Sequence, residues 1–591
     1  MTVVNTVSLG TPVNSLENRT ASICIRNAVP YLVIAAKGLL LSVNLETHQV
    51  CQLDYPKETN GEYPYDSCSD MSGLFYTSAG KLILVYDPEK NSWYDVQKHA
   101  INSEEIAGIC MTASNRDNKV YFSSYPGTYL SEYNSDTKML SLLEQLDENE
   151  MYTGTMAICN KGWIYAGIGT HRKDIIAFHP EKSEKVSFLK DEERTSGYGY
   201  VCETVTGEVF GRKDRDDEEN WYSLIDGRCK SIDQPVELIQ SVQGAGFHRI
   251  NHSNRFQGEV RYSLPDQTCT INGSDIPLNY QSKGADLSPI TQWNGAIIGT
   301  SNHPLRLYSY QTDYRVYPKE IVQYGGGGNI CAYTKWGDSL YGAAYAGGHI
   351  HRISQHEEGL KVDYLSSVPE IYRPRAAVTM NDNSKLLFGG FGAYGVLGGG
   401  LVVLDPKTEE IDVWNNEDLV VGESIVSLAA YAEDLVAAGT SIETPGGAKP
   451  ISQNAHLLVL DIKNKKKVEV HSFERVREIK QLAVDKKGML HLITGCSLYI
   501  VWDLNKKEEI SRTDLKYYGV IVREGMVQQG DVLYFIFSKA LLKVKNEQIG
   551  VLQHLQLEAT MGGAIIKNQL YYTSRAELHA LLLEEEVPCI D

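Results

Sequence analysis

The sequence predicts an all-β protein of the β-propeller class, and three observations lead to that prediction. No long segment keeps apolar residues at the i, i+3, i+4, i+7 spacing of an amphipathic helix. Short runs rich in Tyr, Val, Ile and Leu alternate with polar residues instead, which is the period-two pattern of half-buried strands. A hairpin signature also recurs along the whole chain at a nearly constant spacing.

The recurring hairpin is an apolar strand, a turn that begins in most copies with Asp, Asn or His, and a second strand. Asp and Asn side chains bond to the backbone two residues onward, and Pro presets φ for a type I turn. The clearest copies begin at Asn44, Asp87, Asn134, His179, Asp405, Asp461 and Asp503, and weaker ones lie near Asp226, Asp266, Gln311, Gln355, Asn546 and Glu584. Successive copies are about 40 to 56 residues apart, mostly near 45, which is typical of propeller blades.

About thirteen copies exceed the roughly four to eight blades of one propeller, so we expect two tandem propellers of six or seven blades each. The first is expected over residues 1–320 and the second over residues 321–591, with the joint between Tyr317 and Gly328. Within the first 20 residues, the strand Val3–Leu9 has no hairpin of its own, and we expect it to close a ring by pairing with later sequence. A single ring with longer, irregular blades is the alternative.

Two glycine-containing insertions interrupt blades in the second half of the chain. They cover Gly389–Gly400 and Glu443–Asn454. Loops between strands lie on the faces of a propeller, where binding sites usually form. We therefore expect both insertions to lie near any functional site of that half.

Charge and targeting features narrow the classes of partner. The chain has 56 basic and 75 acidic residues, a formal charge of −19, which disfavours nucleic acid and anionic membranes. The N-terminus lacks a signal-peptide pattern, and the longest apolar run, Tyr31–Val43, contains Lys37 and is too short to span a bilayer. Eleven cysteines without a Cys-x-x-Cys pair indicate reduced thiols. We expect a cytoplasmic protein, and the sequence makes no prediction of oligomeric state.

The usual metal and nucleotide motifs are absent from the sequence. No His-Glu-x-x-His, EF-hand or zinc-spaced Cys/His cluster occurs, and His349 with His351 is more typical of two capped imidazoles than of a metal site. The glycine runs Gly325–Gly328 and Gly398–Gly400 do not belong to a βαβ unit. No Gly-x-Ser-x-Gly motif indicates a serine nucleophile. We expect neither a metal nor a cofactor.

His, Arg and Tyr residues recur near the ends of the expected inner strands and form the candidate site. These residues are Tyr125, His171, Arg172, His248, Arg249, His303, Arg306, Arg373, Arg375 and Tyr394. Equivalent positions in successive blades converge on one face, so scattered residues can build one pocket. Structural interpretations remain open for each: Tyr125 as a turn aromatic, Arg172 as an ion-paired loop residue, and Arg373 and Arg375 as contacts between blades.

These residue types suit removal of a proton next to a carboxylate. His titrates near neutral pH, Tyr can act as an acid, and Arg binds a carboxylate with two parallel hydrogen bonds. This set without a metal is what β-elimination from a uronic acid requires. Glycoside hydrolysis by paired carboxylates remains open, although most acidic residues fall in turns and in solvent-facing runs such as Lys213–Glu219.

The segment Val120-Tyr-Phe-Ser-Ser-Tyr125-Pro-Gly-Thr-Tyr-Leu-Ser-Glu-Tyr, followed by Ile164-Tyr-Ala-Gly-Ile-Gly-Thr170-His171-Arg172, resembles the propeller-fold polysaccharide lyases. Among them it is most similar to the L-rhamnose-α-1,4-glucuronate lyase type. Tyr372-Arg-Pro-Arg and Gly389-Gly-Phe-Gly-Ala-Tyr-Gly are similar to the glycine-rich blade of the same group. The resemblance implies His171 and Tyr125 as acid and base, Arg172 and Arg249 as carboxylate binders, and no essential metal.

The sequence therefore favours an intracellular enzyme that cleaves a small, uronate-containing acidic oligosaccharide by β-elimination. The first alternative is a non-catalytic propeller that binds a protein or peptide, and the second is a glycoside hydrolase with paired carboxylates. Fold alone does not separate these functions. A lyase requires the His, Tyr and Arg side chains in one deep pocket, whereas a scaffold presents a broad, flat aromatic surface.

Overall fold

The computed structural model of the chain is built from strands joined by turns. The described residues are 6–14, 16, 18–59, 64–99, 101, 107–114, 116–204, 206–233, 249–251, 256–302, 305–311, 314–316, 328–357, 359–546 and 548–583. They contain 53 strands and four 3₁₀ helices, η1 (Lys57–Thr59), η2 (Asp191–Glu193), η3 (Pro369–Ile371) and η4 (Lys516–Tyr518). No helix among them is long and apolar enough to cross a bilayer. The predicted all-β propeller class is confirmed.

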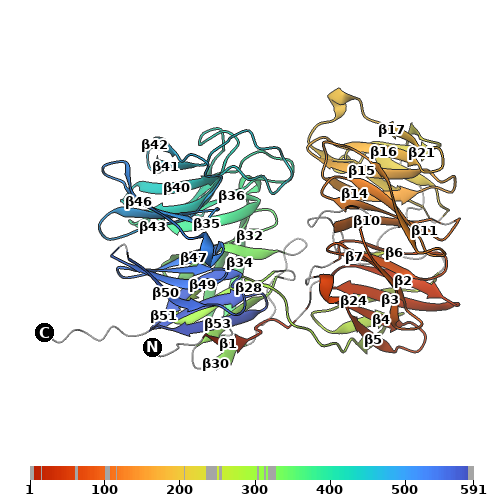
Figure 1. Cartoon of the computed structure of the whole chain (residues 1–591), viewed down its shortest axis with the longest axis horizontal. Coiled ribbons are helices and arrows are strands. Elements are labelled where there is room, and N and C mark those ends of the chain that lie inside the picture. The colour runs from red at the N-terminus through yellow and green to blue at the C-terminus, as the bar shows by residue number, and fades with distance from the viewer. Residues whose placement is uncertain are drawn as a thin grey trace. The chain divides into compact units, whose positions relative to one another are not determined.

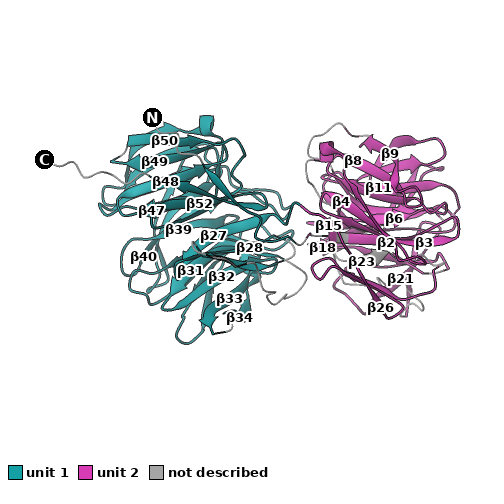
Figure 2. Cartoon of the chain, turned by 90° about the horizontal axis from the view of Figure 1, so that it is seen from below, with its two compact units in different colours: residues 1–15, 283–591 teal, residues 16–282 magenta. Residues whose placement is uncertain are grey.

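The chain separates into two compact units, coloured differently in Figure 2. Unit 2 covers residues 16–282, and unit 1 combines residues 1–15 with residues 283–591. The division therefore follows residue 282, whereas the hairpin spacing placed it near residue 320. Repeat spacing alone does not show to which ring a blade belongs, and the blade that begins at Leu287 packs with unit 1.

Unit 2 consists of small antiparallel sheets in chain order (Figure 1). The sheets are β2 (Asn18–Arg26), β3 (Val29–Ala36), β4 (Leu39–Asn44) and β5 (Val50–Asp54); β6 (Ser67–Ser69), β7 (Phe75–Ala79), β8 (Leu82–Asp87) and β9 (Ser92–Lys98); β10 (Ala107–Ala113), β11 (Lys119–Tyr125), β12 (Tyr129–Asn134) and β13 (Met139–Gln145); β14 (Tyr152–Ile158), β15 (Ile164–Thr170), β16 (Asp174–His179) and β17 (Glu184–Ser187), with β18 (Gly197–Tyr198) beside β15; β19 (Tyr200–Glu203), β20 (Val209–Arg212), β21 (Trp221–Ile225) and β22 (Arg228–Ile232); and β24 (Val260–Ser263), β25 (Thr268–Ile271) and β26 (Ser274–Pro277). The short strand β23 (Arg249–Asn251) pairs in parallel with β2.

Unit 1 has the same construction. Its sheets are β27 (Leu287–Trp293), β28 (Ala296–Ser301), β29 (Leu307–Gln311) and β30 (Tyr314–Val316); β31 (Asn329–Trp336), β32 (Ser339–Tyr345), β33 (His349–His356) and β34 (Gly359–Ser367); β35 (Arg373–Thr379), β36 (Leu386–Phe391), β37 (Leu401–Leu404) and β38 (Ile411–Trp414); β39 (Ser424–Ala430), β40 (Leu435–Ser441), β41 (His456–Asp461) and β42 (Lys466–Ser472); β43 (Ile479–Val484), β44 (Met489–Thr494), β45 (Leu498–Asp503) and β46 (Glu508–Asp514); β47 (Ile521–Gln529), β48 (Val532–Phe537), β49 (Ala540–Lys545) and β50 (Gln548–His554); and β51 (Met561–Ile566), β52 (Gln569–Ser574) and β53 (Glu577–Leu582), with β1 (Val7–Gly10). The last two groups are joined by a parallel contact between β47 and β51.

The first strand of each sheet in unit 1 lies innermost and forms a ring around the axis. Each innermost strand contacts the innermost strands of its two neighbours, and β27 contacts both β31 and β51, so the ring is closed. Antiparallel connectivity places the end of each second strand on the same face of the unit as the start of the first strand. Loops after second strands therefore surround one mouth of the axial channel.

Turn chemistry explains the hairpins between third and fourth strands. The Asn44 side-chain oxygen accepts hydrogen bonds from the backbone N–H groups of Glu46 and Thr47, both at 2.9 Å. The Asp405 carboxylate accepts one from Lys407 N–H at 2.8 Å, and the Asp503 carboxylate accepts one from Asn505 N–H at 2.9 Å. These are the side-chain to backbone bonds that the recurring Asp/Asn positions predicted.

Tyrosine rings fill much of the space between neighbouring sheets. Tyr76, Tyr86 and Tyr133 are fully buried, and hydroxyl groups of this kind need partners when buried. Tyr76 donates to Asp70 at 2.7 Å and Tyr133 to Asp95 at 2.8 Å. The 36 tyrosines of the sequence thus contribute both apolar area and hydrogen bonds between strands.

The N-terminal strand completes the last sheet of unit 1. β1 pairs antiparallel with β53, with Val7 opposite Ala580 and Ser8 opposite His579. The Ser8 hydroxyl donates to Glu577 at 2.8 Å. Val13 is buried in the core cluster between the last and first sheets of the unit. Of the strand expected over Val3–Leu9, residues 3–5 lie outside the described residues; the structure has β1 over Val7–Gly10, which pairs with β53 of the later sequence.

The ten described cysteines are free thiols, with no disulfide among them. No group of three metal-ligating side chains occurs in the described ranges. His349 accepts or donates a hydrogen bond with the Ser367 hydroxyl at 2.6 Å, and His351 is buried at its side. In this part of the chain, the two imidazoles pack with Tyr364.

Removal of residues 1–10 should weaken unit 1 selectively, because it exposes the edge of β53. We expect faster amide hydrogen exchange in β51–β53 and a lower unfolding temperature for unit 1. The strands of unit 2 provide the internal control, since they make no pair with β1. Unchanged exchange in β53 would contradict the assignment of β1 as the closing strand.

Candidate functional site

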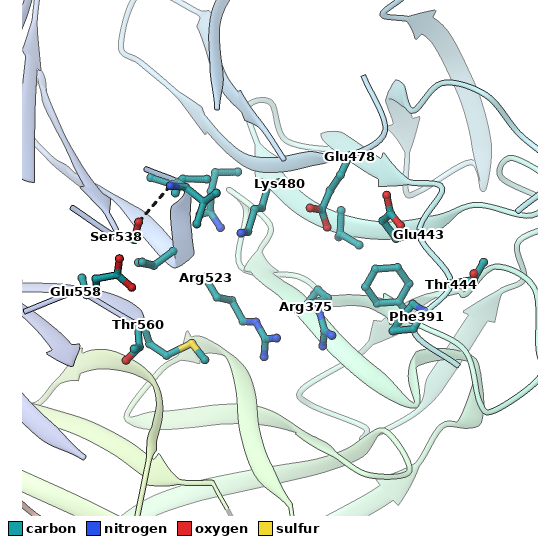
Figure 3. A pocket seen from close by; sticks show the side chains of 18 residues that line it. Arg375, Phe391, Glu443, Thr444, Glu478, Lys480, Arg523, Ser538, Glu558 and Thr560 are labelled. Carbon is teal, nitrogen blue, oxygen red and sulfur yellow. Dashed lines mark hydrogen bonds between the residues drawn. The ribbon is translucent and has the colours of Figure 1, made fainter. Parts of the chain in front are cut away.

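A cavity of about 620 Å³ lies at the axis of unit 1 (Figure 3). Its walls come from the innermost strands β35, β39, β43, β47 and β51 and from the loops that precede or surround them. The lining residues are Arg375, Phe391, Val426, Glu443, Thr444, Pro445, Glu478, Lys480, Gln481, Val520, Ile521, Val522, Arg523, Ser538, Glu558, Ala559, Thr560 and Met561. The volume falls within the ~300–1,000 Å³ range of small-molecule sites.

A β-bulge near the start of each innermost strand determines which residues line this cavity. The register between first and second strands shifts around Arg375, around Lys480, and over a longer stretch that includes Arg523. A bulge leaves one or more residues without a pairing partner and redirects their side chains. The same shift occurs at Cys331 and Val426, so the repeat places one variable side chain per blade near the axis.

Three cationic side chains therefore meet in one cavity. Figure 3 shows the guanidinium groups of Arg375 and Arg523 next to each other, with Lys480 and Glu478 nearby. Arg375 donates one side-chain N–H to the Pro374 carbonyl at 2.8 Å. Within the described ranges, no carboxylate forms an ion pair with any of the three cations. The nearest acidic group, Glu478, interacts with all three through space.

Burial and mutual repulsion shift the titration of these groups. Burial, together with the positive charge of Arg523, lowers the pKa of Arg375 to about 9. Burial also lowers the pKa of Lys480, and it raises the pKa of Glu478 despite the neighbouring cations. Burial raises the pKa of Glu524, the residue after Arg523, from 4.5 to about 7. Perturbed groups of this kind cluster at functional sites.

The close packing of β51 against the bulge of β47 requires glycine. A Cβ atom on Gly562 would lie 2.2 Å from the backbone carbonyl oxygen of Glu524. The Met-Gly-Gly start of β51 therefore lets the backbone around Arg523 and Glu524 approach the neighbouring strand. This approach fixes where both side chains leave the backbone.

The mouth of the cavity is bounded by the two insertions. Glu443, Thr444 and Pro445 line it from the loop between β40 and β41, and Phe391 lines it from the end of β36. The insertions touch each other, because Gly395 N–H donates to the Gly446 carbonyl at 3.0 Å. Glu443 is paired with Arg477 at 2.7 Å, so its charge is already compensated.

The sequence-predicted residues of unit 1 have different environments. Arg375 lines the cavity. Arg373 is buried among tyrosines: its guanidinium lies 4.1 Å from the Tyr394 ring centre, and it donates to the Gly392 carbonyl at 3.2 Å. Arg306 is buried beside the end of β28, where its backbone N–H donates to the Ser301 hydroxyl. His303 lies outside the described residues.

Arg373 and Tyr394 therefore form a packed cluster with Tyr345 and Tyr372. The Tyr345 and Tyr394 hydroxyls are 3.1 Å apart, and both Tyr345 and Tyr372 rings lie within 5.6 Å of the guanidinium. Desolvation by burial raises the pKa of Tyr345. These contacts join β35 and the first insertion to Tyr345 at the end of β32 in the neighbouring blade, and a contact between blades is the structural role considered for Arg373.

In unit 2, Tyr125, His171 and Arg172 lie at or just after the ends of the second strands β11 and β15. Tyr125 stacks on Tyr152 with ring centres 4.5 Å apart. His171 is exposed, and the backbone N–H groups of His171 and Arg172 donate to the Glu150 carboxylate. The Arg172 guanidinium is paired with Asp191 at 2.8 Å on the surface. Arg249 lies on β23 without a described side chain, and His248 lies outside the described residues.

The ten predicted residues are thus divided between the two units. Tyr125, His171, Arg172 and Arg249 belong to unit 2, while Arg306, Arg373, Arg375 and Tyr394 belong to unit 1. Within the described side chains, direct contact joins Arg373 with Tyr394. Their shared role in one catalytic site stays a prediction.

The sequence prediction did not include the cavity residues Lys480, Arg523 and Glu478. The repeat itself contains a signal for these residues. When the starts of the innermost strands are aligned, the residue at the axis falls at the same position of each repeat. The aligned segments are Asn-Ile-Cys331, Arg-Pro-Arg375, Ser-Ile-Val426, Glu-Ile-Lys480 and Ile-Val-Arg523. Three of these five positions are cationic. The sequence prediction considered His, Arg and Tyr residues near the ends of the expected inner strands, and of those residues Arg375 lines the cavity.

Comparisons with known proteins give no family. No family model and no curated protein matches the chain. Among solved structures, an extracellular domain described as part of a hybrid two-component system from B. thetaiotaomicron has 12% identity and a TM-score of 0.38 over 95% of this chain and 69% of its own. YCF48 bound to a D1 peptide has 7% identity and a TM-score of 0.39 over 52% of this chain and 94% of its own. These similarities support no functional assignment.

Substitution of Arg373 should destabilise the protein far more than substitution of Arg172. Arg373→Ala removes a buried cation from three tyrosine faces and should cost about 2–4 kcal/mol of unfolding free energy. Arg172→Ala removes an exposed pair worth about 0.5 kcal/mol or less. Chemical denaturation of both variants checks this; equal losses would contradict the structural role of Arg373.

The buried carboxyl of Glu524 should make unit 1 less stable at high pH. Its pKa is higher in the folded protein than in the unfolded chain, so its stabilising contribution is complete below pH 4.5 and is lost as pH rises through about 7. Glu524→Gln should therefore gain up to about 3 kcal/mol relative to the parent protein between pH 4.5 and pH 8. Denaturation of unit 1 at both pH values measures the difference, with the exposed Glu357→Gln as control. A constant difference across that interval would contradict the burial of Glu524.

Proposed function

We propose that unit 1 binds a small carboxylate-bearing ligand, an acidic sugar or short uronate oligosaccharide, in its axial cavity. One observation carries the proposal. Arg375, Lys480 and Arg523 line the same cavity, and within the described ranges no carboxylate forms an ion pair with any of them. Like charges held together in a half-buried place cost free energy unless an anion neutralises them. A carboxylate fits a guanidinium fork with two parallel hydrogen bonds.

The charge distribution supports a short ligand. The chain as a whole carries −19, which disfavours a long polyanion at a distance. The cavity has the opposite sign locally, and its walls shield the interaction from salt. A molecule small enough to enter the 620 Å³ cavity is attracted by the positive charges inside it, and the negative net charge of the whole chain affects it little.

β-Elimination is the catalytic form of this proposal, favoured by the Lys480 amine in the wall of the cavity. Lys480, with its lowered pKa, can take the proton next to a bound uronate carboxylate. The released electron pair forms a carbon–carbon double bond, and the glycosidic oxygen leaves and takes up a proton. Arg375 and Arg523 would stabilise the enolate-like transition state.

His171 and Tyr125 remain the alternative acid and base, in unit 2. The resemblance to rhamnose–glucuronate lyases is the support for them, whereas burial and pKa favour the axial cavity of unit 1. Single variants in each unit separate the two assignments, because each removes one candidate base and leaves the other unit unchanged.

Binding should depend on the axial arginines. Isothermal titration of D-glucuronate and short uronate oligosaccharides should show binding that Arg375→Gln and Arg523→Gln each weaken by at least about tenfold, the value of one charge-assisted contact. Arg512→Gln, which removes an ion pair on the outer strand β46, is the matched control and should bind like the parent protein. Binding unaffected by the two axial substitutions would contradict the proposal.

Ultraviolet absorbance during the same incubations tests elimination, because the new double bond is conjugated to the carboxylate. A rising signal that Lys480→Met abolishes supports catalysis in unit 1. A signal lost in His171→Ala alone assigns it to unit 2. Binding without absorbance change leaves unit 1 as a binding module.

A further inference from the structure

We infer that the ligand of the axial cavity carries two carboxylates on one small molecule, an inference that rests on the proposed anion-binding function. Arg375, Lys480 and Arg523 contribute three positive charges, and Glu478 is the carboxylate that interacts with them through space. Glu443 is neutralised by Arg477, and Glu558 is exposed at the rim. The inner part of the cavity therefore has an excess of two positive charges.

The three cations come from three separate blades, which spreads the excess charge over the cavity. Arg375 leaves from β35, Lys480 from β43 and Arg523 from β47. Arg375 is also restrained, because its side chain bonds to the carbonyls of Arg373 and Pro374 and lies over Phe391 at 5.0 Å. One carboxylate occupies the adjacent guanidinium pair, and it leaves one excess charge unneutralised.

A second carboxylate of the ligand, near Lys480, supplies the negative charge that neutralises this remaining positive charge. Figure 3 places Lys480 apart from the paired guanidinium ends of Arg375 and Arg523, on the side of Glu478. Glu478 is thus a partial internal counter-ion that a ligand carboxylate must compete with. Its burial makes it a poor one, since its pKa is raised in spite of the cations around it.

The experiment compares three probes of graded charge with the full-length protein. D-Glucuronate has one carboxylate, D-glucarate has two on a chain of the same length, and digalacturonate has two on adjacent sugars. Titrations at pH 6 keep the simple carboxylate probes fully ionised. We expect D-glucarate or digalacturonate to bind at least about tenfold more tightly than D-glucuronate. The stronger of the two shows whether the pair of carboxylates comes from one sugar acid or from two uronates.

Two substitutions change the excess positive charge of the cavity in opposite directions. A merely structural role of these residues would not change the preference for two carboxylates in opposite directions. Glu478→Gln should strengthen the preference for two carboxylates, because it raises the excess charge to three. Lys480→Met should remove the preference, because it lowers the excess charge to one, so it should weaken D-glucarate and digalacturonate binding more than D-glucuronate binding. Thermal unfolding of each variant checks folding, and Lys539→Met, outside the inner cavity, is the matched control.

The outcomes separate the two proposals. Equal affinity for one and two carboxylates, with both weakened by Arg523→Gln, would overturn the two-carboxylate inference and keep the anion-binding function. A preference that persists in Lys480→Met, or that Glu478→Gln abolishes, would also overturn the inference. No binding of any probe would overturn the anion-binding function as well.

Discussion

The exposed edge of a β-sheet has to be paired or covered, and this requirement determines how unit 1 is assembled from its first strand to its last. Each sheet buries both faces against its neighbours, so the ring is stable only when the last sheet meets the first. β51 contacts β27 on the inside, and β1 covers β53 on the outside. The chain therefore starts and ends in one ring, and unit 2 is inserted between residues 15 and 283.

The same closure creates the site. Innermost strands that run in the same direction around an axis bring equivalent positions to one level, and a bulge near each start turns an unpaired residue toward the channel. In most blades this residue is small, apolar or a thiol, as at Val426 and Cys331. In three blades it is cationic, at Arg375, Lys480 and Arg523. A repeated structural irregularity thus forms the proposed binding site through side-chain changes alone.

The fold was largely predictable from the sequence, and the site was not. Asp and Asn in turns act locally, so Asn44 and Asp405 made the hairpins visible without any knowledge of tertiary contacts. Assignment of blades to rings depends on contacts between residues hundreds of positions apart, such as Val7 with Ala580, which no local pattern encodes. Residues after second strands are easily seen because they follow apolar runs. Lys480 and Arg523 lie near the starts of first strands beside Glu478 and Glu524, where neighbouring opposite charges look like a solvent-facing segment.

The contrast between global and local charge links the fold to the proposed chemistry. An acidic surface keeps large polyanions away, whereas three cations at the axis attract a small anion that has already entered the mouth. Burial then has opposite effects on two groups inside the cavity: it makes Lys480 easier to deprotonate and Glu478 easier to protonate. A bound carboxylate relieves the repulsion between the cations and favours the protonated state of Lys480. Ligand binding and the availability of a base are therefore coupled, so a substrate that leaves Lys480 uncompensated keeps its amine reactive, and one that neutralises it is held without reaction.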